Sequence, residues 1–136
     1  MKRYHLFILK RETVKLSQRN SNILYLLLKN LYELNEKDLI YGISVYHQLC
    51  MPINKKLLIN YMIDKVPSLK KSPDTFKILS FFENTKVTIN YSNILVTTDV
   101  DTPEIYKIFN IYNDSIFACD FENNNYFWLN KKVHKK

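Results

Sequence analysis

The chain has 136 residues, a formal charge of +7 and 46% apolar residues, which suits one domain around one core. Its single glycine, Gly42, excludes glycine-rich phosphate loops, the dinucleotide-binding fingerprint and the nucleophile elbow, each of which needs several glycines. Two cysteines, Cys50 and Cys119, are too few for a disulfide framework, so we expect free thiols in a reducing compartment.

The first elements are predicted from the spacing of apolar residues. An aromatic and aliphatic run over 4–9 predicts a short buried strand. The polar residues 11–20 predict a loop or an irregular turn. The helical spacing of Ile23, Leu24, Leu27, Leu28 and Leu31 predicts an amphipathic helix over 22–34 that buries this stripe. Residues 36–50 are ambiguous: β-branched side chains favour a strand, but the spacing is mixed and Gly42 interrupts it.

The middle of the chain predicts a further helix and several strands. Asn54 begins a helix over 55–65, because its side chain can accept a hydrogen bond from a free backbone N–H. Apolar residues predict a strand near 76–81, and alternating apolar and polar residues predict another over 87–91. A tight turn at Ser92-Asn93 then predicts a return strand over 94–98. Asp101 is the predicted cap of the next helix, which has a proline at its first position.

The chain closes with a predicted hairpin, 116–121 and 126–129, around a polar turn. The order of elements predicts one α+β domain over residues 1–130, with a mostly antiparallel or mixed sheet and about three packed helices. Residues 131–136 hold four lysines and form a predicted basic, solvated tail.

The positive charge lies at the two ends of the chain. Residues 2–19 carry a net +5, residues 131–136 a net +4, and residues 21–130 a net −2. The N-terminal cluster consists of Lys2, Arg3, Lys10, Arg11, Lys15 and Arg19. Such a cluster suits either an acidic protein partner or phosphates, and it speeds the encounter with both.

No apolar run approaches the roughly 20 residues that a membrane span needs. The run Leu6–Leu9 is also too short for the apolar region of a signal peptide. We therefore expect a cytoplasmic protein with no membrane partner.

Residues for an enzyme are sparse. His47 and Cys50 would share a face on a helix, but a structural zinc site usually has four ligands. Asp99 and Asp101 suit a divalent cation, although Asp101 fits better as a helix cap. We expect no catalysis, cofactor, metal or small-molecule substrate. The ten Tyr and eight Phe residues are expected mostly in the core, then at interfaces, and last as platforms for bases.

The closing hairpin carries a motif. It reads Ala118-x-Asp120-Phe121 and then Tyr126-x-Trp128-Leu129-Asn130. This resembles the closing motif of the sporulation inhibitor of replication (SirA) family of endospore-forming Firmicutes. The opening Met1-x-Arg3 with Lys10-x-Glu12, and the middle segment Glu36-Lys37-x-Leu39-x-Tyr41, are also similar to that family and occur in its order.

The resemblance implies a non-enzymatic protein that binds the N-terminal domain of the replication initiator DnaA. It would thereby inhibit chromosome replication at the onset of sporulation. Tyr41 matches the family and is the best contact candidate, and its alternative role is a packed sheet residue. Asp38, Val14, Leu16 and Arg11 are contact candidates by position only, because residues 11–17 lack the family's aromatic side chains.

The matched hairpin residues are expected to be structural. Trp128 should fill the core, and Asp120 should accept backbone N–H groups in the hairpin turn. The alternative function is a small nucleic-acid-binding module that uses the N-terminal Lys/Arg cluster and exposed aromatics. Direct nucleic-acid binding ranks behind the protein partner, and an enzyme around His47 and Cys50 ranks third.

Overall fold

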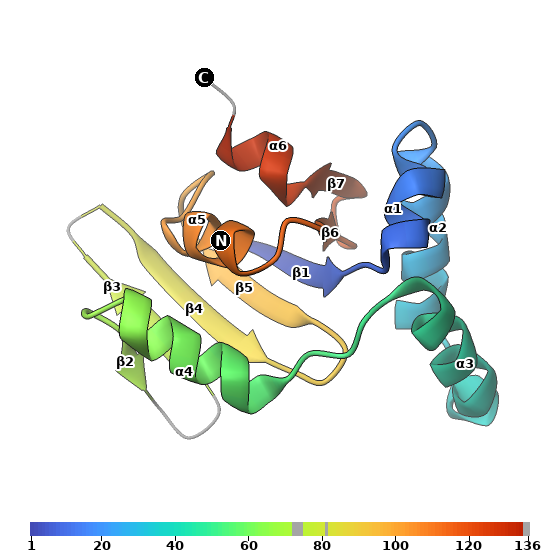
Figure 1. The fold of residues 1–136 in the computed structure, drawn as a ribbon, viewed down its shortest axis with the longest axis horizontal. Helices are drawn as coiled ribbons and strands as arrows, with labels where there is room; N and C mark the ends of the chain where they lie inside the picture. Colours follow the sequence, from blue (N-terminus) through green and yellow to red (C-terminus); the bar gives the residue numbers. More distant parts are fainter. Residues whose placement is uncertain (72–74, 81, 135–136) are drawn as a thin grey trace.

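The computed structural model describes residues 1–71, 75–80 and 82–134 (Figure 1). Its elements in chain order are β1 (Lys2–Ile8), α1 (Arg11–Ser17), α2 (Ser21–Tyr32), the 3-10 helix η1 (Glu36–Asp38), α3 (Leu39–Leu49), α4 (Lys55–Lys65), β2 (Lys70–Lys71), β3 (Phe76–Leu79), β4 (Asn84–Ile89), β5 (Ile94–Thr98), α5 (Ile105–Tyr112), β6 (Ile116–Asp120), β7 (Asn125–Trp128) and α6 (Leu129–Val133).

The strands form one sheet in the order β2-β3-β4-β5-β1-β6-β7, and every neighbouring pair is antiparallel. The strand β1 lies inside the sheet, between β5 and β6. The predicted α+β class with an antiparallel sheet is confirmed. The prediction of about three helices is too low, since the described residues contain six α-helices.

Alternate residues of β1 point into two different cores. Tyr4, Leu6 and Ile8 pack with α4, α5 and α6, where Met62 and Phe109 are fully buried. Phe7, and Leu9 just after the strand, face the opposite side of the sheet and pack with α2 and the end of α3. Helices therefore lie on both faces of the sheet, as the period of two along a strand requires.

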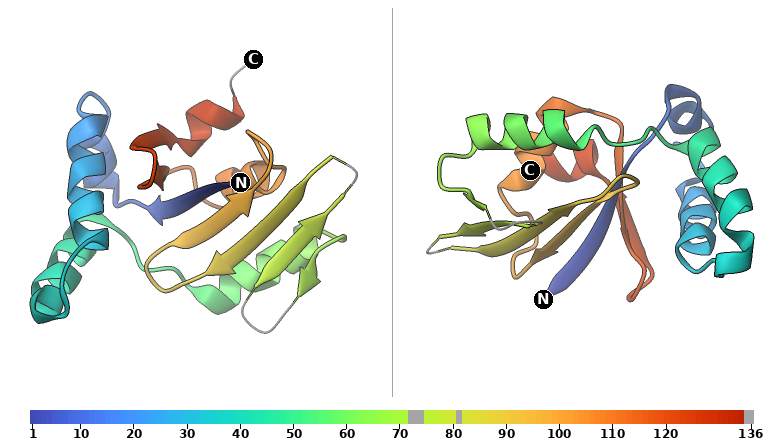
Figure 2. Two further views of the ribbon diagram at one scale, coloured as in Figure 1. Left: turned by 180° about the vertical axis from the view of Figure 1, so that it is seen from behind. Right: turned by 90° about the horizontal axis from the view of Figure 1, so that it is seen from below.

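The two faces are covered unequally. The helices α1, α2 and α3 gather at the β1-β6-β7 side of the sheet (Figure 2). On the face of the sheet that carries Phe7, none of the described helices covers β2, β3, β4 and β5. This part of the face is open in both views of Figure 2. Side chains on that open side, such as Lys77 and Lys86, are exposed.

Two segments are helical where the sequence predicted otherwise. Residues 11–20 were expected as a loop, yet Arg11–Ser17 forms α1, and the hydroxyl of buried Thr13 donates to the carbonyl of Leu49 at 2.8 Å. This contact spans 36 residues and leaves no local pattern. Residues 36–50 favoured a strand by composition, but tertiary packing overrides that preference.

Packing explains why α3 is a helix. Gly42 and Tyr46, one turn apart, face inward, which requires the helical period. A Cβ atom on Gly42 would lie 2.5 Å from Leu34 Cδ1, so the missing side chain lets α3 approach the segment after α2. Gly42 therefore permits close packing rather than interrupting a strand.

The ends of two predicted elements also differ. α5 begins at Ile105 and Asp101 does not cap it, because Lys132 binds the Asp101 carboxylate at 2.8 Å. The basic tail does not start at residue 131, since 131–133 belong to α6. Phe81, expected in a strand, and residues 135–136 of the predicted tail lie outside the described residues.

Candidate protein-binding site

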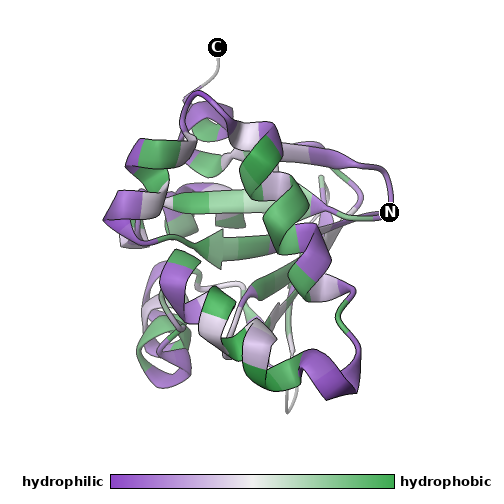
Figure 3. Cartoon of the chain, turned by 90° about the vertical axis from the view of Figure 1, so that its right-hand side faces the viewer, coloured by the Kyte–Doolittle hydropathy of each residue, from purple (hydrophilic) through white to green (hydrophobic). Residues whose placement is uncertain are grey.

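Helices α2 and α3 expose apolar side chains to solvent. Each side chain of the set is at least 40% exposed, with Ile40 at 86% and Tyr41 at 66%. The set on the side of the α2-α3 groove, called here the helix-hairpin surface, comprises Ile23, Leu26, Leu27, Ile40 and Tyr41, whereas the exposed Leu39 and Ile43 line the cavity on the other side of α3. Figure 3 faces this end of the molecule and shows hydrophobic segments interleaved with hydrophilic ones along the helices. Exposed apolar patches mark surfaces that bind other macromolecules.

Tyr41 lies on the exposed side of α3. It lines a groove of about 360 Å³ together with Leu27 and Leu34, which come from α2 and the segment after it. The alternative that Tyr41 is a packed sheet residue is wrong, because it is helical and exposed. A partly supported ring beside an apolar groove has the form of an interface anchor.

The other four contact candidates fall into two groups. Asp38 is exposed at the end of η1, three residues before Tyr41. Arg11 and Leu16 are exposed on α1, and Val14 is half-buried against the second core. Thr13 binds Leu49 at the far end of α3. Tyr41 precedes Leu49 by eight residues, or about 12 Å along the helix axis. The candidates on α1 therefore lie near the opposite end of α3 from Tyr41 and Asp38.

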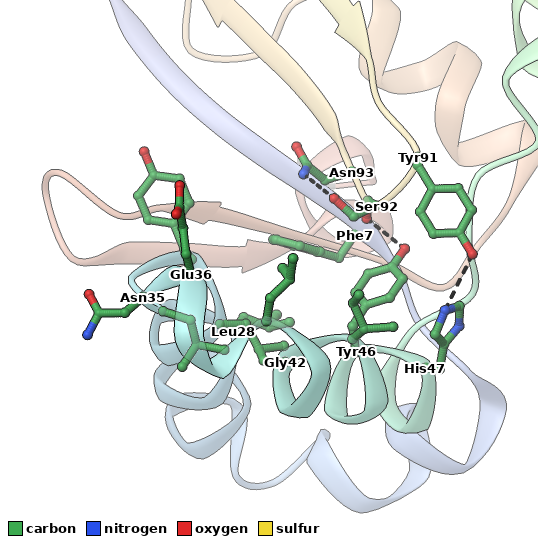
Figure 4. A pocket seen from close by; sticks show the side chains of 15 residues that line it. Phe7, Leu28, Asn35, Glu36, Gly42, Tyr46, His47, Tyr91, Ser92 and Asn93 are labelled. Atoms are coloured by element: carbon green, nitrogen blue, oxygen red, sulfur yellow. Dashed lines mark hydrogen bonds between the residues drawn. The ribbon is translucent and has the colours of Figure 1, made fainter.

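A second cavity, of about 340 Å³, opens between α3 and the sheet (Figure 4). Its wall is mainly apolar and includes Phe7, Leu28 and Leu39. At its rim, the Tyr91 hydroxyl lies 3.4 Å from His47 Nε2, and the Tyr46 hydroxyl donates to the Ser92 carbonyl at 2.9 Å. These contacts join α3 to the β4-β5 turn at the rim of the cavity.

Sequence reasoning missed most of these surface residues. The period over 22–34 placed Ile23 and Leu27 on a buried stripe, whereas both are exposed. The available signal was that α2 is apolar around more of its circumference than one stripe needs, since Leu26 and Leu27 follow the buried Leu24 and Tyr25.

The closing motif is structural. Asp120 is 3% exposed, and its Oδ1 accepts the backbone N–H groups of Glu122 and Asn123, as expected. Trp128 is buried, packs edge-on against Phe117 at 4.9 Å and donates its Nε1–H to Ser21 Oγ at 2.9 Å.

The remaining motif residues support the same hairpin. Ala118 and Leu129 are fully buried, and Phe121 is nearly so. Tyr126 stacks on Tyr25 of α2 at 5.1 Å. The carbonyl of Asn130 accepts the N–H of His134 at the end of α6. The closing hairpin thus packs α2 against the sheet.

The possible catalytic or metal-binding pairs are separated. His47 turns to Tyr91, while Cys50 is fully buried, and burial raises the pKa of its thiol to about 12. A hydrogen bond from Lys132, aided by the charge of Lys2, lowers the pKa of Asp101. In the part of the chain that the structure describes, no three His, Cys, Asp or Glu side chains gather in a metal-binding group.

The structure disperses the N-terminal Lys/Arg cluster. Lys2 pairs with Asp101 at 3.7 Å, and Arg3 pairs with Glu122 at 3.6 Å on the opposite side of the strand. Arg11 and Lys15 belong to α1. The cluster is therefore not one surface.

No protein-family model matches this chain, and no curated protein matches it. Among the described residues, no helix is long and apolar enough to cross a membrane.

Proposed function

We propose that the chain is a non-enzymatic binding protein that inhibits replication initiation by docking on the N-terminal domain of DnaA. The observation that carries the proposal is the helix-hairpin surface, with Tyr41 exposed beside the α2-α3 groove. The resemblance of the opening, middle and closing segments to the SirA family supplies the partner.

The inhibitor acts by occupying the partner's surface. Apolar side chains that are exposed in the free protein gain free energy when the partner covers them, and a tyrosine beside a groove is a typical anchor. Arg11 and Lys15 are exposed on α1, which contacts the far end of α3, and their charges add long-range attraction to an acidic partner. This mechanism needs no cofactor.

Calorimetric titration of the protein into the isolated N-terminal domain of its own host's DnaA tests the proposal. We expect saturable binding, and Tyr41→Ala should weaken it about 30-fold, the effect of losing about 2 kcal/mol at a central anchor. Ile111→Ala is the matched control, because Ile111 is 75% exposed on α5 at the other face and should bind as the wild type.

Absence of binding by the folded wild-type chain at about 50 µM overturns the proposal, since specific complexes of ordinary affinity register there. Equal weakening by Ile111→Ala and Tyr41→Ala would contradict the placement on α2 and α3. Circular dichroism of each variant shows that it is folded.

A further inference from the structure

A row of basic side chains crosses the open half of the sheet. The register pairs Lys70 with Lys77, Lys77 with Lys86, and Lys86 with Thr97, and Thr97 also pairs with Arg3. Directly paired residues of antiparallel strands point to the same side. The basic sheet face, defined as Arg3, Lys70, Lys77 and Lys86, therefore forms one row across five strands, about 19 Å long at about 4.8 Å per strand.

The row lies on the side of the sheet that the helices leave uncovered. Along β3 and β4, Phe76, Ile78 and Val87 are buried against α4 and α5, whereas Lys77 and Lys86 are exposed. No described helix lies over them (Figure 2). The lysines thus have free access to a ligand as large as a polymer.

Among the described residues, the fold pairs Arg3 of this row with a carboxylate but not the three lysines. Glu122 lies 3.6 Å from Arg3, in an exposed pair, and within the described residues Lys70, Lys77 and Lys86 have no ion pair. Asp99, two residues beyond Thr97, accepts the backbone N–H of Asn84. Like charges directly opposite each other destabilise a sheet, and this sheet has two such pairs, Lys70–Lys77 and Lys77–Lys86. A bound polyanion relieves that repulsion.

An exposed aromatic ring stands beside the end of the row. Tyr32, at the end of α2, is 54% exposed and stacks on Phe121 with ring centroids 4.6 Å apart and an interplanar angle of 21°. Its ring also lies 5.0 Å from His5, which is two residues from Arg3 and on the same side of β1. The ring is held by Phe121 and His5, while the residue as a whole stays 54% exposed.

We propose that the basic sheet face and Tyr32 bind single-stranded nucleic acid, with phosphates along the row and a base on the Tyr32 ring. Single strands are held by basic surfaces that follow the backbone and by aromatic rings that stack on bases. A duplex is less suited, because its bases are read by an element that enters a groove, and this face is a flat sheet. The lysine row lies on the sheet, away from the helix-hairpin surface, and Tyr32, although it belongs to α2, lines the cavity beside the sheet and not the groove at Tyr41.

Fluorescence anisotropy of a labelled 20-nucleotide oligo(dT), measured from about 20 to 200 mM NaCl, tests the site. Each phosphate contact contributes about −0.7 to the slope of log K against log salt, so four contacts predict a slope of about −2.8. The variant Lys70→Gln/Lys77→Gln/Lys86→Gln should reduce it to about −0.7.

The matched control is Lys55→Gln/Lys56→Gln/Lys107→Gln, which removes the same charge from exposed lysines of α4 and α5 and should retain the slope. Equal effects of the two triple variants overturn the proposal, because net charge alone would then explain binding. Failure of the wild-type chain to bind at 20 mM NaCl also overturns it.

The aromatic contribution is tested with Tyr32→Leu. It should weaken binding about 5-fold or more without changing the slope, since base stacking does not release counterions. Tyr41→Ala should bind oligo(dT) as the wild type, which keeps this test distinct from the DnaA experiment. Polyglutamate binding that matches oligo(dT) and is unaffected by Tyr32→Leu would refute nucleic acid as the ligand.

Discussion

Replacing Trp128 with alanine should remove much of the free energy that holds α2 on the sheet. The side chain is 8% exposed and contacts Phe117, and its indole N–H bonds Ser21 at the start of α2. Burying about 200 Å² at about 25 cal/mol/Å² gives about 5 kcal/mol as an upper bound. Truncation of buried Trp costs about 3–5 kcal/mol, so we expect about 4 kcal/mol.

Urea denaturation followed by far-UV circular dichroism measures this loss. Fluorescence is unsuitable, because Trp128 is the chain's single tryptophan. With a slope near 2 kcal/mol per molar urea, the midpoint should fall by about 2 M. A domain of this kind has about 5–15 kcal/mol of stability, so the variant can still fold.

The control is Trp128→Phe, which keeps an aromatic ring against Phe117 but loses the N–H donor to Ser21. It should lose about 1–2 kcal/mol, a hydrogen bond plus some packing. A loss below about 1 kcal/mol in Trp128→Ala would refute the reasoning, because it would mean that the site rearranges without the ring.

Three further predictions concern stability and thiol chemistry. Burial lowers the pKa of His5 below 6.5, so the unfolded chain binds more protons and the free energy of unfolding should fall as pH drops below about 6.5. Urea titrations at pH 7.5 and 5.5 should show a smaller pH difference in His5→Gln. Gly42→Ala should change stability by less than about 1 kcal/mol in urea titration, because the gain in helix propensity offsets displacement of the Leu34 methyl group. Both cysteines are buried with raised thiol pKa values, about 12 for Cys50, so Ellman's reagent should label Cys50 and Cys119 only on unfolding; rapid labelling of the native protein would contradict this.

Local sequence patterns correctly predicted the features whose stabilising contacts lie within a few residues of one another. In β4, Val87 and Ile89 are buried on either side of a half-buried Thr88, as the alternation from residue 87 indicates. Asn54 accepts the N–H of Leu57 at 3.1 Å, the bond expected of a cap. Asp120 likewise binds N–H groups only two and three residues away. In each case the partner lies within a few residues.

The elements that failed depend on distant partners. α1 is fixed in part by Thr13, which bonds Leu49, and α3 in part by the Tyr46 hydroxyl, which bonds the Ser92 carbonyl 46 residues later. Asp101 was assigned to its own helix but binds Lys132, 31 residues later.

The candidate surfaces were predicted only in part. Tyr41 was chosen from a motif and is exposed, but its helix was not foreseen. The basic sheet face was missed because the net charge of residues 21–130 is slightly negative, and only the strand register brings Lys70, Lys77 and Lys86 into line with Arg3.

The place of β1 inside the sheet affects how the protein folds during synthesis. β1 precedes both of its neighbours, and its register pairs His5 with Leu95 on one side and with Cys119 on the other. Such distant pairing slows folding, because long loops must close before the contacts form. Until β5 and β6 leave the ribosome, both edges of β1 and its apolar side chains lack their partners and are prone to aggregation. α1, α2 and α3 are synthesised before β6 and β7, so α2 cannot make its contacts with Tyr126 and Trp128 until the closing hairpin has been synthesised.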